Sequence, residues 1–271
     1  MTDPAQLLAA YDTQLRTDAE TSGATSVTRQ GPLHLASFPG GRGFITYRDL
    51  GGADADRIQG LVSAAITHFR DDPEISRVEW KTRAHDHAPG LHEALLDNGF
   101  AAGEPESIMV GEARALAIDV PLPEGVSLRR VTDEDDVRAA SALADEVFGG
   151  TVSAAESEAM VDDLLRRLSR DDGVELWVAE APGPKTGRLI VSTGRLEPVR
   201  GTDFAGIWGG ATRPGWRGRG IYRALTAARA RSALTLGKTL VNSDSTEYSR
   251  PILERSGLVR VSTTTPYTWR R

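Results

Sequence analysis

The sequence contains no cysteine, no long hydrophobic run and no excess of positive charge. The absence of cysteine from all 271 residues excludes disulfide bonds, thiolate–zinc sites and a cysteine nucleophile. No apolar run approaches the roughly 20 residues that span a bilayer. The first residues, MTDPAQLLAAYDTQ, lack the basic flank and apolar core of a signal peptide. We therefore expect a cytoplasmic protein without a membrane partner.

Positive charge is in the minority, because 32 Lys and Arg residues face 38 Asp and Glu residues, which gives a net charge of −6. A nucleic-acid-binding protein is expected to carry a basic stripe, so this balance argues against such a partner. The remaining composition, with 39% hydrophobic residues and a mean hydropathy of −0.31, is that of a globular chain. Its length allows one large domain or two small ones.

Histidine is confined to the first half of the chain. His85 and His87 flank Asp86 in a way that imitates a metal-binding pair, but third and fourth ligands at suitable spacing are missing. Solvated loop positions are the simpler interpretation of these histidines. We expect no bound metal.

One stretch combines a strand, a glycine-rich turn and a basic helix. Residues 204–212 are apolar, and Pro214-Gly215 then breaks the strand as turn dipeptides do. After a turn of alternating arginine and glycine, apolar residues recur at helical spacing in a run without proline or glycine: Ile221, Ala224, Leu225 and Ala228. The sequence therefore predicts that glycines stand at the entrance of a helix over residues 221–236.

A helix entrance of this kind favours an anionic ligand. The first N–H groups of a helix have no partner within it, and the helix dipole favours negative charge there. Glycines let the backbone come close to a phosphate, and three arginines add positive charge: Arg217, Arg219 and Arg223. The stretch lacks both the Gly-Lys-Ser/Thr ending of nucleoside-triphosphate loops and the three spaced glycines of dinucleotide-binding turns. An ordinary turn with a solvated arginine face is the alternative.

The turn Arg217-Gly218-Arg219-Gly220-Ile221-Tyr222 resembles the pyrophosphate loop of the GCN5-related N-acetyltransferase (GNAT) family. In that family, an Arg/Gln-x-x-Gly-x-Gly/Ala loop holds the pyrophosphate of coenzyme A. Arg217 and Gly220 match the first two fixed positions, whereas Tyr222 stands where the family usually has Gly or Ala. The resemblance implies acetyl-CoA as a cosubstrate, bound by the six residues of this turn: Arg217, Gly218, Arg219, Gly220, Ile221 and Tyr222.

The resemblance also implies contacts for the rest of the coenzyme. In the family, the strand before the loop and the strand after its helix splay apart, and the pantetheine arm pairs with backbone groups of the first strand. This arrangement puts Gly210, Ala211 and Thr212 at the pantetheine. By the same comparison, Thr246 and Ser249 lie near the lower arm of the coenzyme.

The groups that transfer protons follow less directly from the resemblance. The family commonly has a tyrosine acid four residues before the glycine that ends the last helix, but Leu253 stands there. Tyr248 and Tyr267 are the candidate catalytic acids in its place, and a buried structural tyrosine is the alternative for each. The strand 204–212 lacks the glutamate base of some members, so proton removal through water stays open. Three acidic residues lie nearby in sequence: Glu197, Asp203 and Asp244.

A domain boundary is expected at the linker 119–125, DVPLPEG, where two prolines and a glycine interrupt the pattern. Residues 126–271 then predict the element order of a GNAT domain, with a last helix at 248–256. Residues 1–118 predict helices at 4–21, 54–69 and 89–98 and strands at 26–38, 40–50 and 75–82. The helix ending at Gly99-Phe100 is echoed at Gly257-Leu258, which indicates a degenerate GNAT-like or auxiliary first domain.

The expected fold class is α/β, in the α+β sense: two tandem GNAT-like domains, each with a mixed, mostly antiparallel sheet flanked by helices. The expected function is acetyl-CoA-dependent N-acetyltransfer to the amine of a small molecule, by direct transfer, in a monomer or homodimer. A coenzyme A-binding sensor or scaffold without transferase activity is the alternative, which the missing tyrosine and glutamate favour. A nucleic-acid-binding module built on the arginine-rich turn is disfavoured by the net negative charge.

Overall fold

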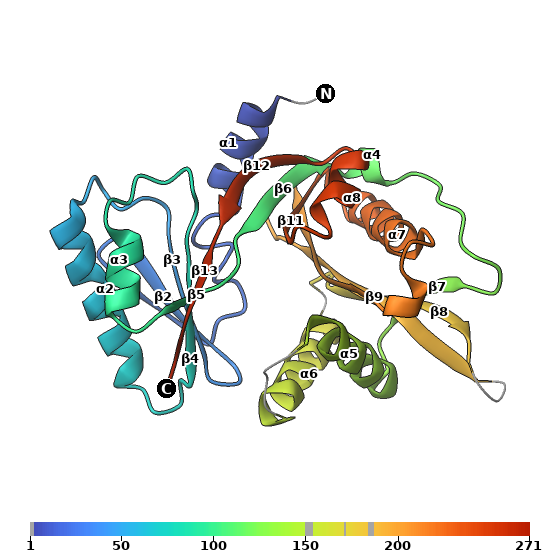
Figure 1. Cartoon of the computed structure of the whole chain (residues 1–271), viewed down its shortest axis with the longest axis horizontal. Helices are drawn as coiled ribbons and strands as arrows, with labels where there is room; N and C mark the ends of the chain where they lie inside the picture. Colours follow the sequence, from blue (N-terminus) through green and yellow to red (C-terminus); the bar gives the residue numbers. More distant parts are fainter. Residues whose placement is uncertain (1–2, 150–153, 171, 184–186) are drawn as a thin grey trace. The chain divides into compact units, whose positions relative to one another are not determined.

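The chain forms two compact units, and its described residues form two β-sheets (Figure 1). The computed structural model describes residues 3–149, 154–170, 172–183 and 187–271. Unit 1 comprises Met1–Ile108, Asp244–Arg250 and Arg260–Arg271, and unit 2 comprises Met109–Ser243 and Pro251–Val259. The expected domains are contiguous ranges, whereas two segments after residue 243 pack with unit 1.

Unit 1 holds a six-stranded sheet in the order β1-β2-β3-β4-β13-β5. Neighbouring strands are antiparallel except β3 and β4, which run parallel and are joined by helix α2. The elements are α1 (Pro4–Gln14), β1 (Ser26–Gln30), β2 (Leu33–Phe38), β3 (Arg42–Tyr47), α2 (Ala55–Arg70), β4 (Arg77–Lys81), α3 (Leu91–Asp97), β5 (Ala101–Ala102) and β13 (Pro266–Arg270).

Two expectations for the first 50 residues are corrected by the structure. The first helix ends at Gln14 and not at residue 21, and Thr17 beyond it takes a left-handed backbone conformation (φ 63°) that a right-handed helix does not contain. The run 26–38 forms two strands and not one, because Gly31 (φ 58°) and Pro32 make the turn between β1 and β2. The expected hairpin at residues 39–41 is confirmed as the connection of β2 to β3.

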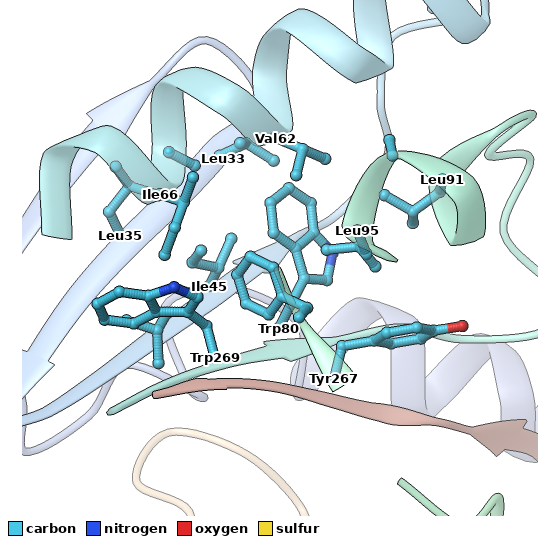
Figure 2. Close-up of a cluster of buried hydrophobic side chains, with 14 of the residues drawn as sticks. Leu33, Leu35, Ile45, Val62, Ile66, Trp80, Leu91, Leu95, Tyr267 and Trp269 are labelled. Carbon is cyan, nitrogen blue, oxygen red and sulfur yellow. The ribbon is translucent and has the colours of Figure 1, made fainter. Parts of the chain in front are cut away.

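The core of unit 1 packs α2 and α3 against the sheet (Figure 2). Helix α2 begins after Asp54, and its buried side chains recur at helical spacing: Ile58, Val62, Ala65, Ile66 and Phe69. Trp80 on β4 is fully buried, and Phe100 contacts it edge-to-face with ring centroids 6.3 Å apart. Tyr267 and Trp269 come from β13, so the last residues of the chain complete this core.

The second sheet has seven strands in the order β12-β6-β11-β10-β9-β8-β7. Strands β7 to β10 are antiparallel neighbours, whereas β10 and β11 run parallel and are joined by helix α7. The elements are β6 (Glu106–Glu112), α4 (Ala113–Leu116), β7 (Ser127–Val131), α5 (Glu134–Phe148), α6 (Ala154–Leu168), β8 (Glu175–Pro182), β9 (Arg188–Pro198), β10 (Phe204–Thr212), a 3-10 turn (Pro214–Trp216), α7 (Ile221–Thr235), β11 (Leu240–Ser245), α8 (Arg250–Arg255) and β12 (Val259–Thr264).

Strand β6 is an element that the sequence pattern does not predict. Its residues 107–110 are all buried, so the alternation that marks a half-exposed strand is missing. The strand lies between β12 and β11 in the seven-stranded sheet. A domain boundary at residues 119–125 therefore assigns β6 to the first domain, although β6 pairs within the seven-stranded sheet.

The helices α3 and α8 end in the same way. The glycines after them, Gly99 and Gly257, both have positive φ (87° and 100°). The next N–H group donates to a leucine carbonyl five residues back in each case, 3.0 Å away: Phe100 to Leu95 and Leu258 to Leu253. This is the longer hydrogen bond of a Schellman cap. The sequence echo between the halves therefore reflects one local motif that occurs twice.

Candidate functional site

Strands β10 and β11 pair only at their beginnings. Their parallel pairing ends with Gly206 opposite Asn242, and within the described residues 207–245 the two strands form no further pair. On its other side, β10 stays paired to β9 as far as Thr212. The edge of β10 from Ile207 onward therefore carries N–H and C=O groups outside the parallel ladder. An extended ligand that contains amides can bind such an edge.

The open edge contains a β-bulge. The register between β9 and β10 shifts between Trp208 and Ala211, and Gly209 takes a left-handed conformation (φ 60°). A bulge takes backbone groups out of the ladder, so they can face a ligand. The predicted contact residues Gly210, Ala211 and Thr212 lie at this bulge and just after it.

Helix α7 begins at a glycine without a side-chain cap. Gly218 and Gly220 have positive φ (73° and 79°), and Gly220 is the N-cap residue. The first turn of α7, which the structure describes completely, contains no acidic residue. The first N–H groups of α7 therefore have neither an intrahelical partner nor a competing carboxylate, and an anion fits there.

The arginines of the turn differ in their contacts. Arg217 donates from Nε to the carbonyl oxygen of Thr212 (3.0 Å), which ties the turn to the end of β10. The guanidinium of Arg219 lies 4.9 Å from the ring centroid of Trp216. Arg223 is exposed in the first turn of α7. The structure thus brings together the predicted strand residues and the predicted turn.

Helix α2 follows the corresponding strand of unit 1 but begins with acidic residues. The Asp54 carboxylate accepts a hydrogen bond from the Arg57 N–H (3.0 Å), and Asp56 stands in the first turn. A side-chain carboxylate already occupies a donor that a phosphate would use, and it repels a phosphate. This helix entrance is therefore unsuited to a pyrophosphate.

Arginine side chains also occupy the ends of the parallel strands of unit 1. The Tyr47 carbonyl, at the end of β3, accepts hydrogen bonds from Nη2 (2.7 Å) and Nε (3.3 Å) of Arg16. The Lys81 carbonyl, at the end of β4, accepts one from Arg83 Nη1 (3.3 Å). Both guanidinium groups are buried and have carboxylate partners, Asp86 for the first and Glu20 for the second. In unit 1, internal cations take backbone acceptors at the strand ends that a ligand would otherwise use.

The remaining predicted site residues lie in the segments of unit 1 that follow β11. Thr246 and Ser249 come together, with their hydroxyl oxygens 3.4 Å apart, just before α8. Tyr248 between them is 81% exposed. Tyr267 is buried in the core, with its hydroxyl 2.6 Å from Nδ1 of His92, and burial raises its pKa. Of the two predicted acids, Tyr248 has the accessible hydroxyl.

Neither Leu253 nor Asp203 places an acid or a base near the bulge. Leu253, at the family's tyrosine position, is fully buried in the core of unit 2. Asp203 precedes β10 and so lies at the end of the strand opposite to the bulge. Its carbonyl oxygen accepts the N–H groups of Thr239 and Leu240 (2.9 and 3.0 Å).

The carboxylates of Glu197 and Asp244 are held by cations. Glu197 lies between Arg167 (2.6 Å) and Arg195 (2.9 Å). Burial alone would raise the pKa of Glu197, but the two guanidinium groups outweigh burial and hold its pKa below the ordinary value. Asp244 lies 2.6 Å from Nζ of Lys81. A low pKa and a paired cation both make a carboxylate a weak base.

Arg229 is a buried charged residue that the sequence pattern did not single out as part of the site. It lies on α7 with 1% of its surface exposed. A signal for it exists in the sequence, because it falls four residues after Leu225 on the stripe that is otherwise apolar. A charged residue on such a stripe points to a specific partner inside the fold.

Solved structures match this fold over most of the chain, although no protein-family model and no curated protein sequence matches it. A GCN5-related N-acetyltransferase from Kribbella flavida is 17% identical, with a TM-score of 0.64 over 99% of this chain and 96% of its own. A tandem GNAT protein from the clavulanic acid biosynthesis pathway is 15% identical, with a TM-score of 0.59 over 98% and 95%. A GCN5-related N-acetyltransferase from Sphaerobacter thermophilus is 17% identical, with a TM-score of 0.60 over 88% and 76%.

These similarities define the fold as that of the GNAT N-acetyltransferases, in its tandem form with two GNAT-like domains in one chain. The expected fold class, with helices flanking mostly antiparallel sheets, is thereby confirmed. No helix in the described part of the chain has the length and apolar character that a bilayer crossing requires. Over the same residues, no three His, Cys, Asp or Glu side chains gather as a metal-binding group.

Proposed function

We propose that the chain is an acetyl-CoA-dependent N-acetyltransferase that acts on the amine of a small molecule. One observation carries the proposal: in unit 2, an open and bulged strand edge leads directly into an uncapped helix entrance, and the Arg217–Thr212 hydrogen bond joins the two. The strand edge suits an extended arm with amides, and the helix entrance suits a pyrophosphate. Coenzyme A carries both groups next to each other.

The proposal gives each part of the site a role. The N–H groups at the start of α7 and the exposed arginines bind the pyrophosphate, through the six residues from Arg217 to Tyr222. Backbone groups of Gly210, Ala211 and Thr212 bind the pantetheine arm. Thr246 and Ser249 are proposed contacts of its lower part.

Acetyl-CoA supplies an activated acetyl thioester to this site. In the proposed reaction the amine nitrogen bonds to the carbonyl carbon, the carbon–sulfur bond breaks, the amine loses a proton and the thiolate gains one. Backbone N–H groups at the bulge donate to the carbonyl oxygen as it becomes negative. The exposed Tyr248 is the proposed acid for the thiolate, ahead of the buried Tyr267. Water is the proposed base, because Glu197 and Asp244 are held by cations.

A coenzyme A-binding sensor or scaffold is the second candidate function. It is favoured by the apolar, buried Leu253 and by the paired state of Glu197 and Asp244. These features weaken proton transfer but leave the strand edge and the helix entrance unchanged.

We expect thiol release from acetyl-CoA to depend on an added amine. Release is measured with a thiol reagent across a panel of aliphatic amines, polyamines, amino sugars and arylamines. Free thiol that appears only with an amine, together with an N-acetylated product in mass spectrometry, supports the transferase. Tight binding of acetyl-CoA without turnover of any amine would contradict the transferase and support the sensor.

We also expect the full chain to bind one equivalent of coenzyme A and not two. The helix entrance of unit 1 carries the Asp54 cap, and Arg16 and Arg83 occupy its strand ends. Isothermal titration calorimetry of the wild-type chain with coenzyme A measures the stoichiometry. A value of two would show that the first domain also binds the coenzyme.

A further inference from the structure

A buried cation lies on the face of α7 that packs against the sheet of unit 2. Arg229 donates from Nη1 to the Arg195 carbonyl (3.1 Å) and from Nη2 to Thr226 Oγ1 (3.2 Å). No carboxylate of the described residues forms an ion pair with it. Burial lowers the pKa of Arg229 to about 10. This pKa still leaves the guanidinium group charged at neutral pH.

Arg229 forms its hydrogen bond to β9 next to the bulge. Arg195 on β9 is the partner of Trp208, and this is the last pair before the register shift. The side chain can reach this carbonyl because Gly194 leaves room: a Cβ atom at Gly194 would lie 2.7 Å from Nη1 of Arg229. A bulge interrupts the ladder between two strands, and here a guanidinium group binds the β9 backbone beside the interruption.

Tyr222 makes a second contact from the same helix face to the bulge. A Cβ atom at Gly210 would lie 2.6 Å from Cε2 of Tyr222, so the tyrosine ring fills the space that any side chain at Gly210 would need. The Tyr222 carbonyl accepts a hydrogen bond from Thr226 Oγ1 (2.9 Å), and Thr226 in turn binds Arg229. Tyr222, Thr226 and Arg229 are spaced by four and three residues, so they form one continuous ridge along α7.

We propose that this ridge, made of Tyr222, Thr226 and Arg229, holds the β10 bulge in position relative to the turn of residues 217–222, with Arg229 as a positioning residue for acyl transfer. The inference rests on the proposed function. It also gives a physical reason for the departure from the family loop pattern: a tyrosine fits at position 222 because position 210 is glycine. Arg229 acts through the strand backbone, because its hydrogen bond to the Arg195 carbonyl holds β9 beside the bulge.

Arg229→Met tests the role of the cation. We expect kcat to fall on the order of tenfold or more and KM for acetyl-CoA to rise by a smaller factor, because the pantetheine contacts at the bulge loosen while the pyrophosphate site is unchanged. Arg229→Lys keeps the charge and is expected to recover part of kcat. Arg231→Met, an exposed arginine on the same helix, is the matched control and should leave kcat unchanged. A folded Arg229→Met protein with wild-type kcat would overturn the proposal.

Gly210→Ala tests the contact with Tyr222. The added methyl group must displace the tyrosine ring or the strand, so turnover should fall. Tyr222→Ala breaks the same contact, so the losses of the two single variants should not add in the double variant Gly210→Ala/Tyr222→Ala. Losses that add fully in the double variant would show that the contact does not position the bulge.

Hydrogen exchange gives a readout that is independent of turnover. Arg229→Met should speed exchange of the amides of residues 207–212 while the amides of α5 keep their wild-type rates. Unchanged exchange at residues 207–212 would overturn the ridge even if the protein is an active transferase. Faster exchange there in a protein that acetylates no amine would support the ridge and remove only the proposed function.

Discussion

Replacing Gly220 with glutamate is expected to abolish measurable binding of coenzyme A. Gly220 is the N-cap of α7 with φ +79°, and a glutamate there adds a negative charge at the point where the N–H groups of the helix converge. A residue with a side chain also pays about 1–2 kcal/mol for a left-handed conformation. The fold has room for it, because among the described residues, apart from its chain neighbours, the nearest atom to an added Cβ is the Pro121 carbonyl oxygen at 3.7 Å. Calorimetry with coenzyme A measures the loss.

Two control variants separate charge from backbone strain. Gly220→Asn introduces a residue that tolerates the left-handed conformation and carries no charge. We therefore expect it to weaken coenzyme A binding far less than Gly220→Glu does. Gly52→Glu introduces the same residue before α2, at φ +70°. Among the described residues no atom other than those of its chain neighbours lies within 4 Å of an added Cβ, so this variant should leave binding unchanged. Wild-type affinity in Gly220→Glu, with a wild-type circular dichroism spectrum, would remove the coenzyme site from this turn.

Deleting residues 265–271 is expected to prevent unit 1 from folding. Strand β13 lies between β4 and β5, so the deletion leaves both without their shared partner. It also removes Tyr267 and Trp269 from the core. The side chain of Arg271 further donates to carbonyl oxygens at the end of α2 and in the loop after it, including Phe69 (3.2 Å) and Asp72 (2.7 Å). Urea unfolding followed by tryptophan fluorescence and circular dichroism measures the effect.

A point variant in the same strand gives a quantitative form of this test. Trp269→Ala should lower the free energy of unfolding by about 3–5 kcal/mol, the usual cost of removing a large buried aromatic. That is a large part of the roughly 5–15 kcal/mol that stabilises a typical domain. Thr268→Ala, on the other face of β13, is the control and should cost less than about 1 kcal/mol. A truncated chain with the wild-type urea midpoint would show that β13 does not hold unit 1 together.

The glycine-rich turn that opens α7 could be predicted because its signal is local. Glycine at a helix entrance, arginine beside it and a preceding apolar strand all lie within residues 204–236. The positive φ of Gly218 and Gly220 and the uncapped start of α7 follow from those residues alone. The roles of the individual coenzyme-binding residues remain predictions, which the Gly220 variants test.

The bulge and its supports could not be predicted from local pattern. The register shift between Trp208 and Ala211 depends on how β9 and β10 align, and the sequence of β10 alone does not define that alignment. Arg229 reaches the β9 backbone only because Gly194 lies opposite it, 35 residues away in the chain. The sequence could not identify the proton-transfer groups for the same reason, because only tertiary contacts show that Glu197 forms ion pairs with Arg167 and Arg195.

The sequence by itself determined most of the helices and strands, the glycine-opened basic helix α7 and the repeated helix ending at Gly99 and Gly257. These features depend on the conformations of a few neighbouring residues and on hydrophobic spacing. Only the tertiary structure decided that the last strand belongs to the first sheet and that β6 belongs to the second. It also decided that arginines occupy the strand ends of unit 1 while the β10 edge stays open. Those outcomes depend on which distant strand edges and buried acceptors meet, and pairing between distant segments leaves no periodic signal in a single sequence.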